Sequence, residues 1–119
     1  MIITISRNRL RPEHQDEYYE MAAKMLDLAK AMPGFVSRKS FEASDGERIA
    51  ITEFASEETH RAWHQHPEHQ IAIKLGRERF YSEFHIQVCS VDKDYDFHHD
   101  ASYQFCVIII TMCCFTNGV

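Results

Sequence analysis

The stretch FVSRKSFEASDGERIAITEF, residues 35–54, decides the fold that the sequence predicts. Two β-prone runs, residues 35–43 and 48–54, are separated by Ser44-Asp45-Gly46-Glu47. Asp-Gly between such runs is a strong signal for a tight hairpin, because glycine adopts positive φ angles at no steric cost. The sequence therefore predicts two antiparallel strands joined by a short turn.

An amphipathic helix is predicted ahead of the hairpin, and a strand ahead of that helix. Apolar residues recur at three- and four-residue spacing between Pro12, a favourable first-turn residue, and Pro33-Gly34, which ends the pattern. These residues are Tyr18, Met21, Ala22, Met25, Leu28, Ala29 and Met32. Further upstream, the β-branched stretch that begins at Ile2 predicts a first strand running to about Arg9.

A second helical region and a last strand are predicted after the hairpin. Ser56 is a favourable N-cap, and Pro67 is expected to stop or bend the helix at His66, because the residue before a proline avoids the helical conformation. A further helical piece then runs from Pro67 toward Arg79. From Phe80 the apolar period changes to two, which is typical of a half-buried strand. The apolar face of this strand holds Phe84, Ile86 and Val88.

The order strand, helix, strand, strand, helix, strand predicts an α+β fold. The ferredoxin-like arrangement fits it, with an antiparallel sheet and both helices on one face. Ile49 and Ile51 lie on one face of their strand and Phe54 on the other, so the face without helices is also apolar. We therefore expect a homodimer in which two sheets close into an α+β barrel.

The chain is expected to hold one compact domain, residues 1–97, and a C-terminal extension, residues 98–119. The extension contains a dense apolar and β-prone run, residues 105–115. Because such a run is an aggregation hazard when exposed, we expect it to form an extra strand at a sheet edge. The alternative is a disordered and dispensable extension.

Charge and composition exclude several classes of function. Lys and Arg number 13 against 18 Asp and Glu, a net charge of −5, and no basic face can be traced, so nucleic-acid binding is not expected. The apolar run 105–115 is shorter than the ~20 residues that span a bilayer, so no membrane insertion is expected. Arg7, Arg9 and Arg11 interrupt the apolar N-terminus, which argues against an export signal. The four cysteines form no C-x-x-C pair, which fits a reducing cytoplasm.

Taken together, the chain resembles the antibiotic biosynthesis monooxygenase superfamily of dimeric α+β barrels over about residues 1–97. The matching segments are Met32-Pro33-Gly34-Phe35, the Asp45-Gly46 hairpin, Glu57-Glu58, Ala62-Trp63, His66-Pro67-Glu68-His69 and Gly76-Arg77-Glu78-Arg79-Phe80-Tyr81. Many members of this superfamily are small proteins, and several chemistries occur among them. The resemblance implies the fold more strongly than it implies one activity.

One activity to compare is cofactor-free formation of quinones from polycyclic aromatic substrates. The resemblance aligns the functional tryptophan of these monooxygenases with Trp63, and Arg77 or Arg79 could supply the positive charge of their pocket. Thr59 and His60 stand where those enzymes have an asparagine.

A second activity is haem degradation. The resemblance covers Asn8-Arg9-Leu10, where these members have a functional asparagine, and Trp63. Their axial histidine lies about ten residues beyond the tryptophan, where this chain has Ile73, and His69 is one helical turn earlier.

The resemblance implies a pocket between the helices and the sheet, in which a small electron-rich aromatic, such as a phenol or hydroquinone, is oxygenated with no metal and no cofactor. Trp63 is expected to form a wall, Asn8 to be a hydrogen-bond partner and His69 to be the base. The substrate-binding residues are expected to be Met25, Phe54, Ile73 and Arg79. The alternatives are a haem-binding or haem-degrading protein and a non-enzymatic dimer that binds a small ligand.

Plainer interpretations of the same residues stay open. Trp63 on a helix that faces a sheet is commonly a core residue, and Asn8 at a strand end commonly bonds only to the backbone. The spacing of His60 and His64 would suit two metal ligands, but a solvated polar face explains the cluster equally. Arginines such as Arg79 commonly pair with nearby acids.

Overall fold

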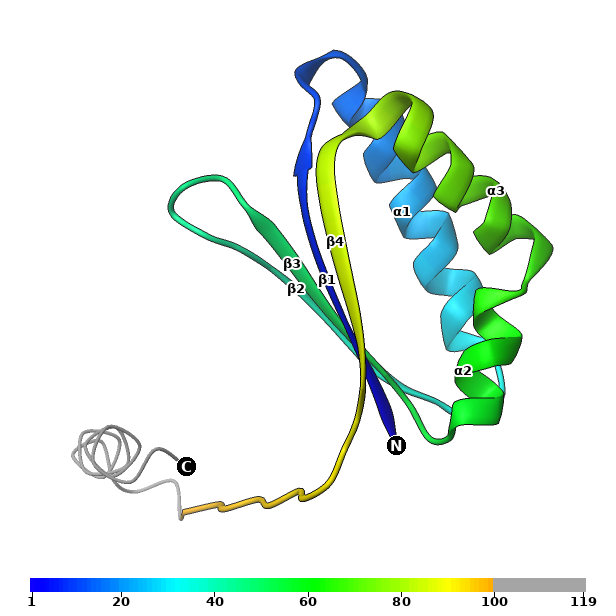
Figure 1. Cartoon of the computed structure of the whole chain (residues 1–119), viewed down its shortest axis with the longest axis vertical. Helices are drawn as coiled ribbons and strands as arrows, with labels where there is room; N and C mark the ends of the chain where they lie inside the picture. The colour runs from blue at the N-terminus through cyan, green and yellow to red at the C-terminus, as the bar shows by residue number, and fades with distance from the viewer. Residues whose placement is uncertain (100–119) are drawn as a thin grey trace.

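The computed structural model describes residues 1–99 and contains a four-stranded antiparallel sheet, order β2-β3-β1-β4, with helices on one face (Figure 1). The strands are β1 (Ile2–Leu10), β2 (Phe35–Glu42), β3 (Arg48–Phe54) and β4 (Tyr81–Ser90). The helices are α1 (Gln15–Lys30), α2 (Glu57–His64) and α3 (Pro67–Leu75). This is the ferredoxin-like α+β arrangement that the sequence predicts.

The hairpin between β2 and β3 forms where it was predicted. Glu42 lies opposite Arg48 in the antiparallel register, and Gly46 adopts the left-handed conformation with φ of 90°. The turn is closed by two backbone hydrogen bonds, from the Gly46 N–H to the Ala43 carbonyl at 3.0 Å and from the Ala43 N–H to the Glu47 carbonyl at 2.8 Å. The Asp-Gly signal was therefore sufficient to locate this turn.

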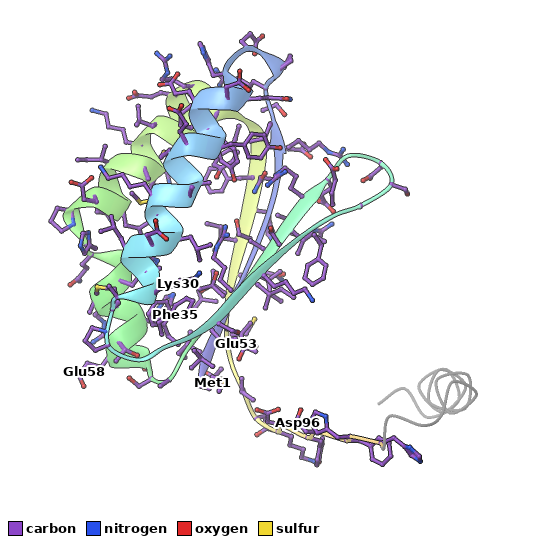
Figure 2. The ribbon with its side chains drawn as sticks, turned by 180° about the vertical axis from the view of Figure 1, so that it is seen from behind. Met1, Lys30, Phe35, Glu53, Glu58 and Asp96 are labelled. Atoms are coloured by element: carbon purple, nitrogen blue, oxygen red, sulfur yellow. The ribbon has the colours of Figure 1, made fainter. Side chains whose placement is uncertain are left out.

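Helix α1 is joined to β2 through a second left-handed glycine. Gly34 has φ of 81°, and its carbonyl accepts a hydrogen bond of 2.7 Å from the Ala55 N–H at the end of β3. A Cβ atom at position 34 would lie 2.5 Å from the Thr59 side chain, so only glycine fits. This contact holds the start of α2 against the end of α1. Figure 2 shows Lys30, Phe35 and Glu58 in this part of the molecule.

Helix α2 begins at the predicted N-cap and stops before the predicted proline. The Ser56 hydroxyl accepts a hydrogen bond of 3.1 Å from the Thr59 N–H, and the Thr59 hydroxyl accepts one of 3.2 Å from the Ser56 N–H. His66 has extended backbone angles, and its Nδ1 accepts a bond of 3.1 Å from the Glu68 N–H, which caps α3. After α3, residues Gly76–Phe80 form a π-helical turn instead of the continued α-helix that was expected.

The core lies between the helices and the sheet. Phe54, Trp63 and Ala29 are buried together, from β3, α2 and α1. The partly buried residues packed against them are Met25, Leu28, Met32 and Phe35. The apolar stripe predicted on α1 therefore does face the sheet, as its spacing implied.

The face of the sheet opposite the helices is called the outer face here. Alternation along the strands places Ile5 of β1 opposite Ile51 of β3 on this face, and Phe41 of β2 opposite Ile49. The outer face therefore has an apolar stripe, formed by Ile3, Ile5, Phe41, Ile49 and Ile51. Phe41 is 47% exposed, and no helix of residues 1–99 covers the stripe (Figure 1).

Strand β4 differs from its prediction in burial. Phe84, Ile86 and Val88 share the helix face, as expected, but they remain 39%, 48% and 57% exposed. The reason is that β4 is an edge strand and the helices leave an open cavity beside it, which these three side chains line.

Residues 91–99 contain neither helix nor strand, and the Val91 N–H donates a hydrogen bond of 3.1 Å to the Met1 carbonyl. The extra strand predicted within the extension lies outside the described residues, so it stays a prediction. Within residues 1–99, the longest helices are too short or too polar to cross a bilayer.

Candidate active site: a cavity between the helices and the sheet

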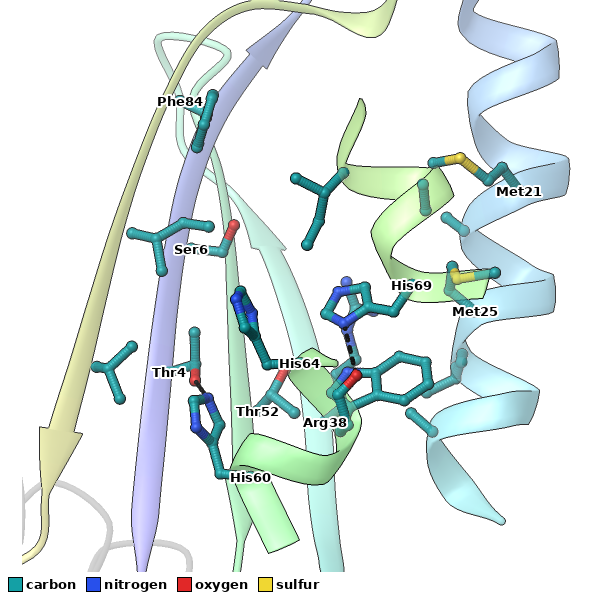
Figure 3. Close-up of a pocket in the computed structure, with 18 of the residues that line it drawn as sticks. Thr4, Ser6, Met21, Met25, Arg38, Thr52, His60, His64, His69 and Phe84 are labelled. Atoms are coloured by element: carbon teal, nitrogen blue, oxygen red, sulfur yellow. Dashed lines mark hydrogen bonds between the residues drawn. The ribbon is translucent and has the colours of Figure 1, made fainter. Parts of the chain in front are cut away.

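A cavity of about 290 Å³ lies between the helices and the helix face of the sheet (Figure 3). Its wall is mainly apolar, and the residues that form this part include Met21, Met25, Phe54, Ile73, Phe84 and Ile86. Polar side chains enter from all sides, among them Thr4, Ser6, Arg38, Thr52, His60 and His69. An apolar cavity with a few polar groups is the usual form of a small-molecule site.

Trp63 and His69 form one side of the cavity as a stacked pair. Their ring centroids are 4.3 Å apart with an angle of 12° between the planes. The His69 Nδ1 lies 3.1 Å from the Trp63 backbone carbonyl oxygen. Because a carbonyl oxygen only accepts hydrogen bonds, Nδ1 carries the proton and Nε2 keeps its lone pair.

The charge state of His69 follows from its surroundings. Burial lowers the pKa of His69 below its usual value, against the opposing effect of the hydrogen bond to Trp63, and the neighbouring histidines lower it further. The imidazole is therefore neutral near pH 7. A neutral imidazole with a free Nε2 can accept a proton from a ligand in the cavity.

His60 also lies in the cavity wall, a position that the sequence analysis did not predict for it. Its Nε2 lies 3.0 Å from the Thr4 hydroxyl, and burial together with the nearby His64 lowers its pKa. His64 lines the cavity too. The sequence offered a metal pair or a solvated face for these histidines. The signal for a cavity position was the spacing of three residues between His60 and Trp63 on one short helix, since residues three apart share a side of a helix.

Tyr81 adds a phenol to the cavity at the start of β4. Burial raises its pKa, with a further contribution from the adjacent Tyr18, so the hydroxyl stays protonated. The ring occupies the space beside Gly76, where a Cβ atom would lie 2.6 Å from it. The glycine thus permits the close packing of this ring against the π-helical turn.

The structure brings five of the predicted site residues together. Trp63, His69, Met25, Phe54 and Ile73 all line the same cavity, although they come from α1, β3, α2 and α3. Trp63 is also a core residue, only 7% exposed. The two interpretations of this tryptophan, core and cavity wall, therefore hold together.

Asn8 lies beside the cavity but is not part of its lining. It is 5% exposed, between Arg48 of β3 and Phe84 of β4 in the sheet register, and its Oδ1 has no hydrogen-bond partner. Its role as a hydrogen-bond partner of the substrate therefore stays a prediction. Its position two residues beyond Ser6 along β1 carries it past the cavity wall.

Arg79, expected to bind the substrate, also lies outside the cavity. Arg77 lines the cavity in its place. The Arg79 guanidinium pairs with Glu17 of α1 at 2.9 Å, whereas the Arg77 guanidinium lies 5.6 Å from the Phe84 ring centroid. The π-helical turn is the reason, because it changes which side chains of residues 76–80 face the sheet. Arg38 of β2, which sequence analysis did not select, is the second cavity arginine.

A metal centre has no support in the part of the chain that the structure describes. Within residues 1–99, no three His, Cys, Asp or Glu side chains are grouped so that they could hold a metal ion. His66 is instead used as the cap of α3.

Comparison with known proteins identifies the family. The sequence profile described as antibiotic biosynthesis monooxygenase matches residues 1–75. The chain belongs to this family. The resemblance stated from the sequence is thus confirmed, and the match includes α1, the hairpin, Trp63 and His69.

Relatives of the family share both sequence and fold with the chain. It is 32% identical over 84 residues to the uncharacterized protein YqjZ of Bacillus subtilis (strain 168), an alignment that covers 71% of this chain and 74% of YqjZ. A candidate antibiotic biosynthesis monooxygenase from Deinococcus radiodurans superposes with a TM-score of 0.72, 11% identity and coverage of 83% and 100%. SnoaB of Streptomyces nogalater, a cofactor-independent oxygenase, superposes with a TM-score of 0.65, 14% identity and coverage of 78% and 94%. At these identities the two structures establish the shared fold.

Proposed function

We propose that the protein is a monooxygenase that oxygenates a small electron-rich aromatic, of the phenol or hydroquinone type, in this cavity and without a cofactor. The observation that carries the proposal is the pairing of His69 with Trp63. The hydrogen bond through Nδ1 leaves Nε2 of the neutral imidazole able to act as a base, and the Trp63 ring stacked on it forms an aromatic wall. Membership of the monooxygenase family and the likeness to a cofactor-independent oxygenase support it.

The proposed reaction begins with proton transfer from the substrate hydroxyl to Nε2 of His69. The resulting anion has electron density on the ring carbon para to the oxygen, and this carbon gives one electron to O₂. Recombination of the two radicals forms a carbon–oxygen bond, and loss of water from the peroxide leaves a quinone. Overall, one phenol and one O₂ give one quinone and one water, so atoms and electrons balance.

The apolar wall has two roles in this reaction. Met25, Phe54 and Ile73 exclude water, which would otherwise stabilise the anion and lower its reactivity toward O₂. Trp63 offers its ring face to an aromatic substrate. A cavity of about 290 Å³ is at the small end of ligand sites, which suits one or two fused rings.

The outer face supports a homodimer as part of the proposal. Its apolar stripe has no cover in one chain, and an exposed stripe of this kind usually marks an interface. A second copy related by a two-fold axis would place stripe against stripe and close two sheets into a barrel.

The haem interpretation has less support than oxygenation without haem. Ile73 lines the cavity at the position where the resemblance to haem-degrading members requires the axial histidine. An isoleucine offers iron no ligand. His69 lies one helical turn earlier and not at that position.

The test is oxygen consumption by metal-free protein with a panel of phenols and hydroquinones, with quinone products identified by mass spectrometry. We expect turnover with at least one compact aromatic and one ¹⁸O atom in the product when ¹⁸O₂ is used. His69→Gln removes the base and should abolish turnover, while His14→Gln, outside the cavity, serves as the matched control. Tight binding of the panel without any oxygen consumption would instead favour a non-enzymatic ligand-binding dimer.

A further inference from the structure

The charged groups of the cavity are all of one sign. Arg38 and Arg77 are among its lining residues, and no Asp or Glu is. Burial lowers the pKa values of the lining histidines His60 and His69, so both are neutral near pH 7 and add no charge. An anionic ligand would therefore meet favourable charge and no repulsion.

The two cavity arginines differ from the other arginines of residues 1–99 in having no hydrogen-bond or ion-pair partner. Ion pairs with carboxylates hold Arg7 to Glu47, Arg9 to Asp45 and Glu83, Arg61 to Glu57, and Arg79 to Glu17. Arg11 donates to backbone carbonyls, and Arg48 donates to the Tyr19 hydroxyl. Within the described residues, the guanidinium groups of Arg38 and Arg77 make neither a hydrogen bond nor an ion pair.

The position of Arg38 makes it the main partner for a ligand. It lies on the helix face of β2 opposite Thr52 of β3, half-buried, and Figure 3 draws it among the side chains around the cavity. The Tyr81 phenol also lines the cavity. Leaving a half-buried guanidinium unpaired costs free energy, and a bound carboxylate would relieve that cost.

Arg77 lies at the exposed rim and has a secondary role. Its guanidinium is held over the Phe84 ring, at the side where the exposed residues of β4 line the cavity. A cation at a cavity rim raises the local concentration of anions and their rate of entry.

We propose that the natural ligand is an aromatic carboxylate, whose carboxylate pairs with Arg38 inside the cavity while its ring lies against Trp63. The proposal rests on the proposed function for the location of the substrate site. It narrows the substrate class from phenols in general to hydroxyaromatic acids. The fork of a guanidinium matches the two oxygens of a carboxylate, which a neutral phenol does not provide.

Anaerobic calorimetry with two probes of equal size tests the proposal. The probes are 1-hydroxy-2-naphthoate and its neutral amide, 1-hydroxy-2-naphthamide. We expect the wild-type protein to bind the carboxylate at least about tenfold more tightly, a difference of about 1.4 kcal/mol. Arg38→Gln should remove this preference by weakening the carboxylate alone, and Arg38→Lys should restore part of it. Arg61→Gln, an exposed arginine on α2 outside the cavity, is the matched control and should change neither affinity.

Retained binding of the amide shows that the Arg38 variant is folded. Equal affinities for the two probes in the wild type, no binding of either at millimolar concentration, or a preference that survives Arg38→Gln would each overturn the proposal. The binding measurement needs no turnover, so its result is independent of whether the proposed oxygenation takes place. Selective binding without oxygen uptake contradicts only the oxygenase, and turnover restricted to neutral phenols contradicts only the carboxylate.

Discussion

The imidazole of His69 is held to Trp63 in two ways at once, by ring stacking at 4.3 Å and by a hydrogen bond of 3.1 Å from Nδ1 to the Trp63 carbonyl oxygen. The first residue lies on α3 and the second on α2, on opposite sides of Pro67. The break between the helices is what lets α3 turn back so that the two rings meet. This relationship determines both the tautomer and the placement of the proposed base.

The first prediction concerns the pH dependence of turnover. The pKa of His69 is lowered below its ordinary value of 6.5, so the base is deprotonated at neutral pH and protonated only in mild acid. We expect kcat/KM to be flat around pH 7 and to fall on the acid side, with an apparent pKa below 6.5. His69→Gln should reduce kcat/KM by about 100-fold or more, the usual contribution of a general base. An undiminished rate in this variant would remove His69 from the mechanism.

The second prediction concerns stability in acid. His60 and His69 have lower pKa values in the folded chain than in the unfolded chain, so the unfolded state binds more protons as the pH falls. Their contribution to stability is present above about pH 6.5 and is lost as the pH falls through their folded values. The melting temperature should therefore fall from pH 7.5 to 5.5. His60→Gln and His69→Gln should each reduce that fall relative to the wild type.

The third prediction compares two glycines with similar backbone angles. Gly34→Ala places a Cβ atom 2.5 Å from Thr59, in addition to the strain of its positive φ. At Gly46 the nearest atom is 3.8 Å away, so Gly46→Ala has the backbone strain alone. We expect Gly46→Ala to cost about 1 kcal/mol in the free energy of unfolding, and Gly34→Ala clearly more. Equal losses in chemical denaturation would show that the contact with Thr59 relaxes freely.

The fourth prediction concerns the outer face. Ile51 lies opposite Ile5 in the centre of the apolar stripe, so Ile51→Glu should disrupt a dimer built on that stripe. Sedimentation velocity should show twice the chain mass for the wild type at micromolar concentration and a monomer for the variant. Ile71→Glu is the control, because Ile71 is 56% exposed on α3 and lies on the helix side. A wild-type monomer with full thermal stability would end the barrel proposal.

The local elements were predictable because their signals are local. The Asp45-Gly46 turn, the Ser56 cap and the helix break before Pro67 depend on the conformational preferences of a few neighbouring residues, and each appears where the sequence placed it. The apolar stripe of α1 and the alternation along β4 depend on helix and strand periods alone. From these, the order of elements and the ferredoxin-like fold follow.

The composition of the site was only partly predictable, because it depends on where distant elements meet. Arg38 and His60 lie on β2 and α2, and nothing in their local sequence marks them as neighbours in one cavity. Their meeting depends on the strand register and on the packing of α2 over the sheet. Side chains from separate elements cannot be matched from spacing along the chain.

Asn8 and Arg79 were predicted as site residues, but the structure places both outside the lining of the cavity. The sequence determined that an asparagine lies near the end of β1 and that two arginines precede β4, and the resemblance to the family made Asn8 and Arg79 candidates for the site. The tertiary structure decided that Asn8 is buried beside the cavity and that Arg79 pairs with Glu17 while Arg77 faces the cavity. The physical reason is that small local shifts move a side chain by several ångströms. For Asn8 the shift is two residues along a strand, and for Arg79 it is a single π-helical turn.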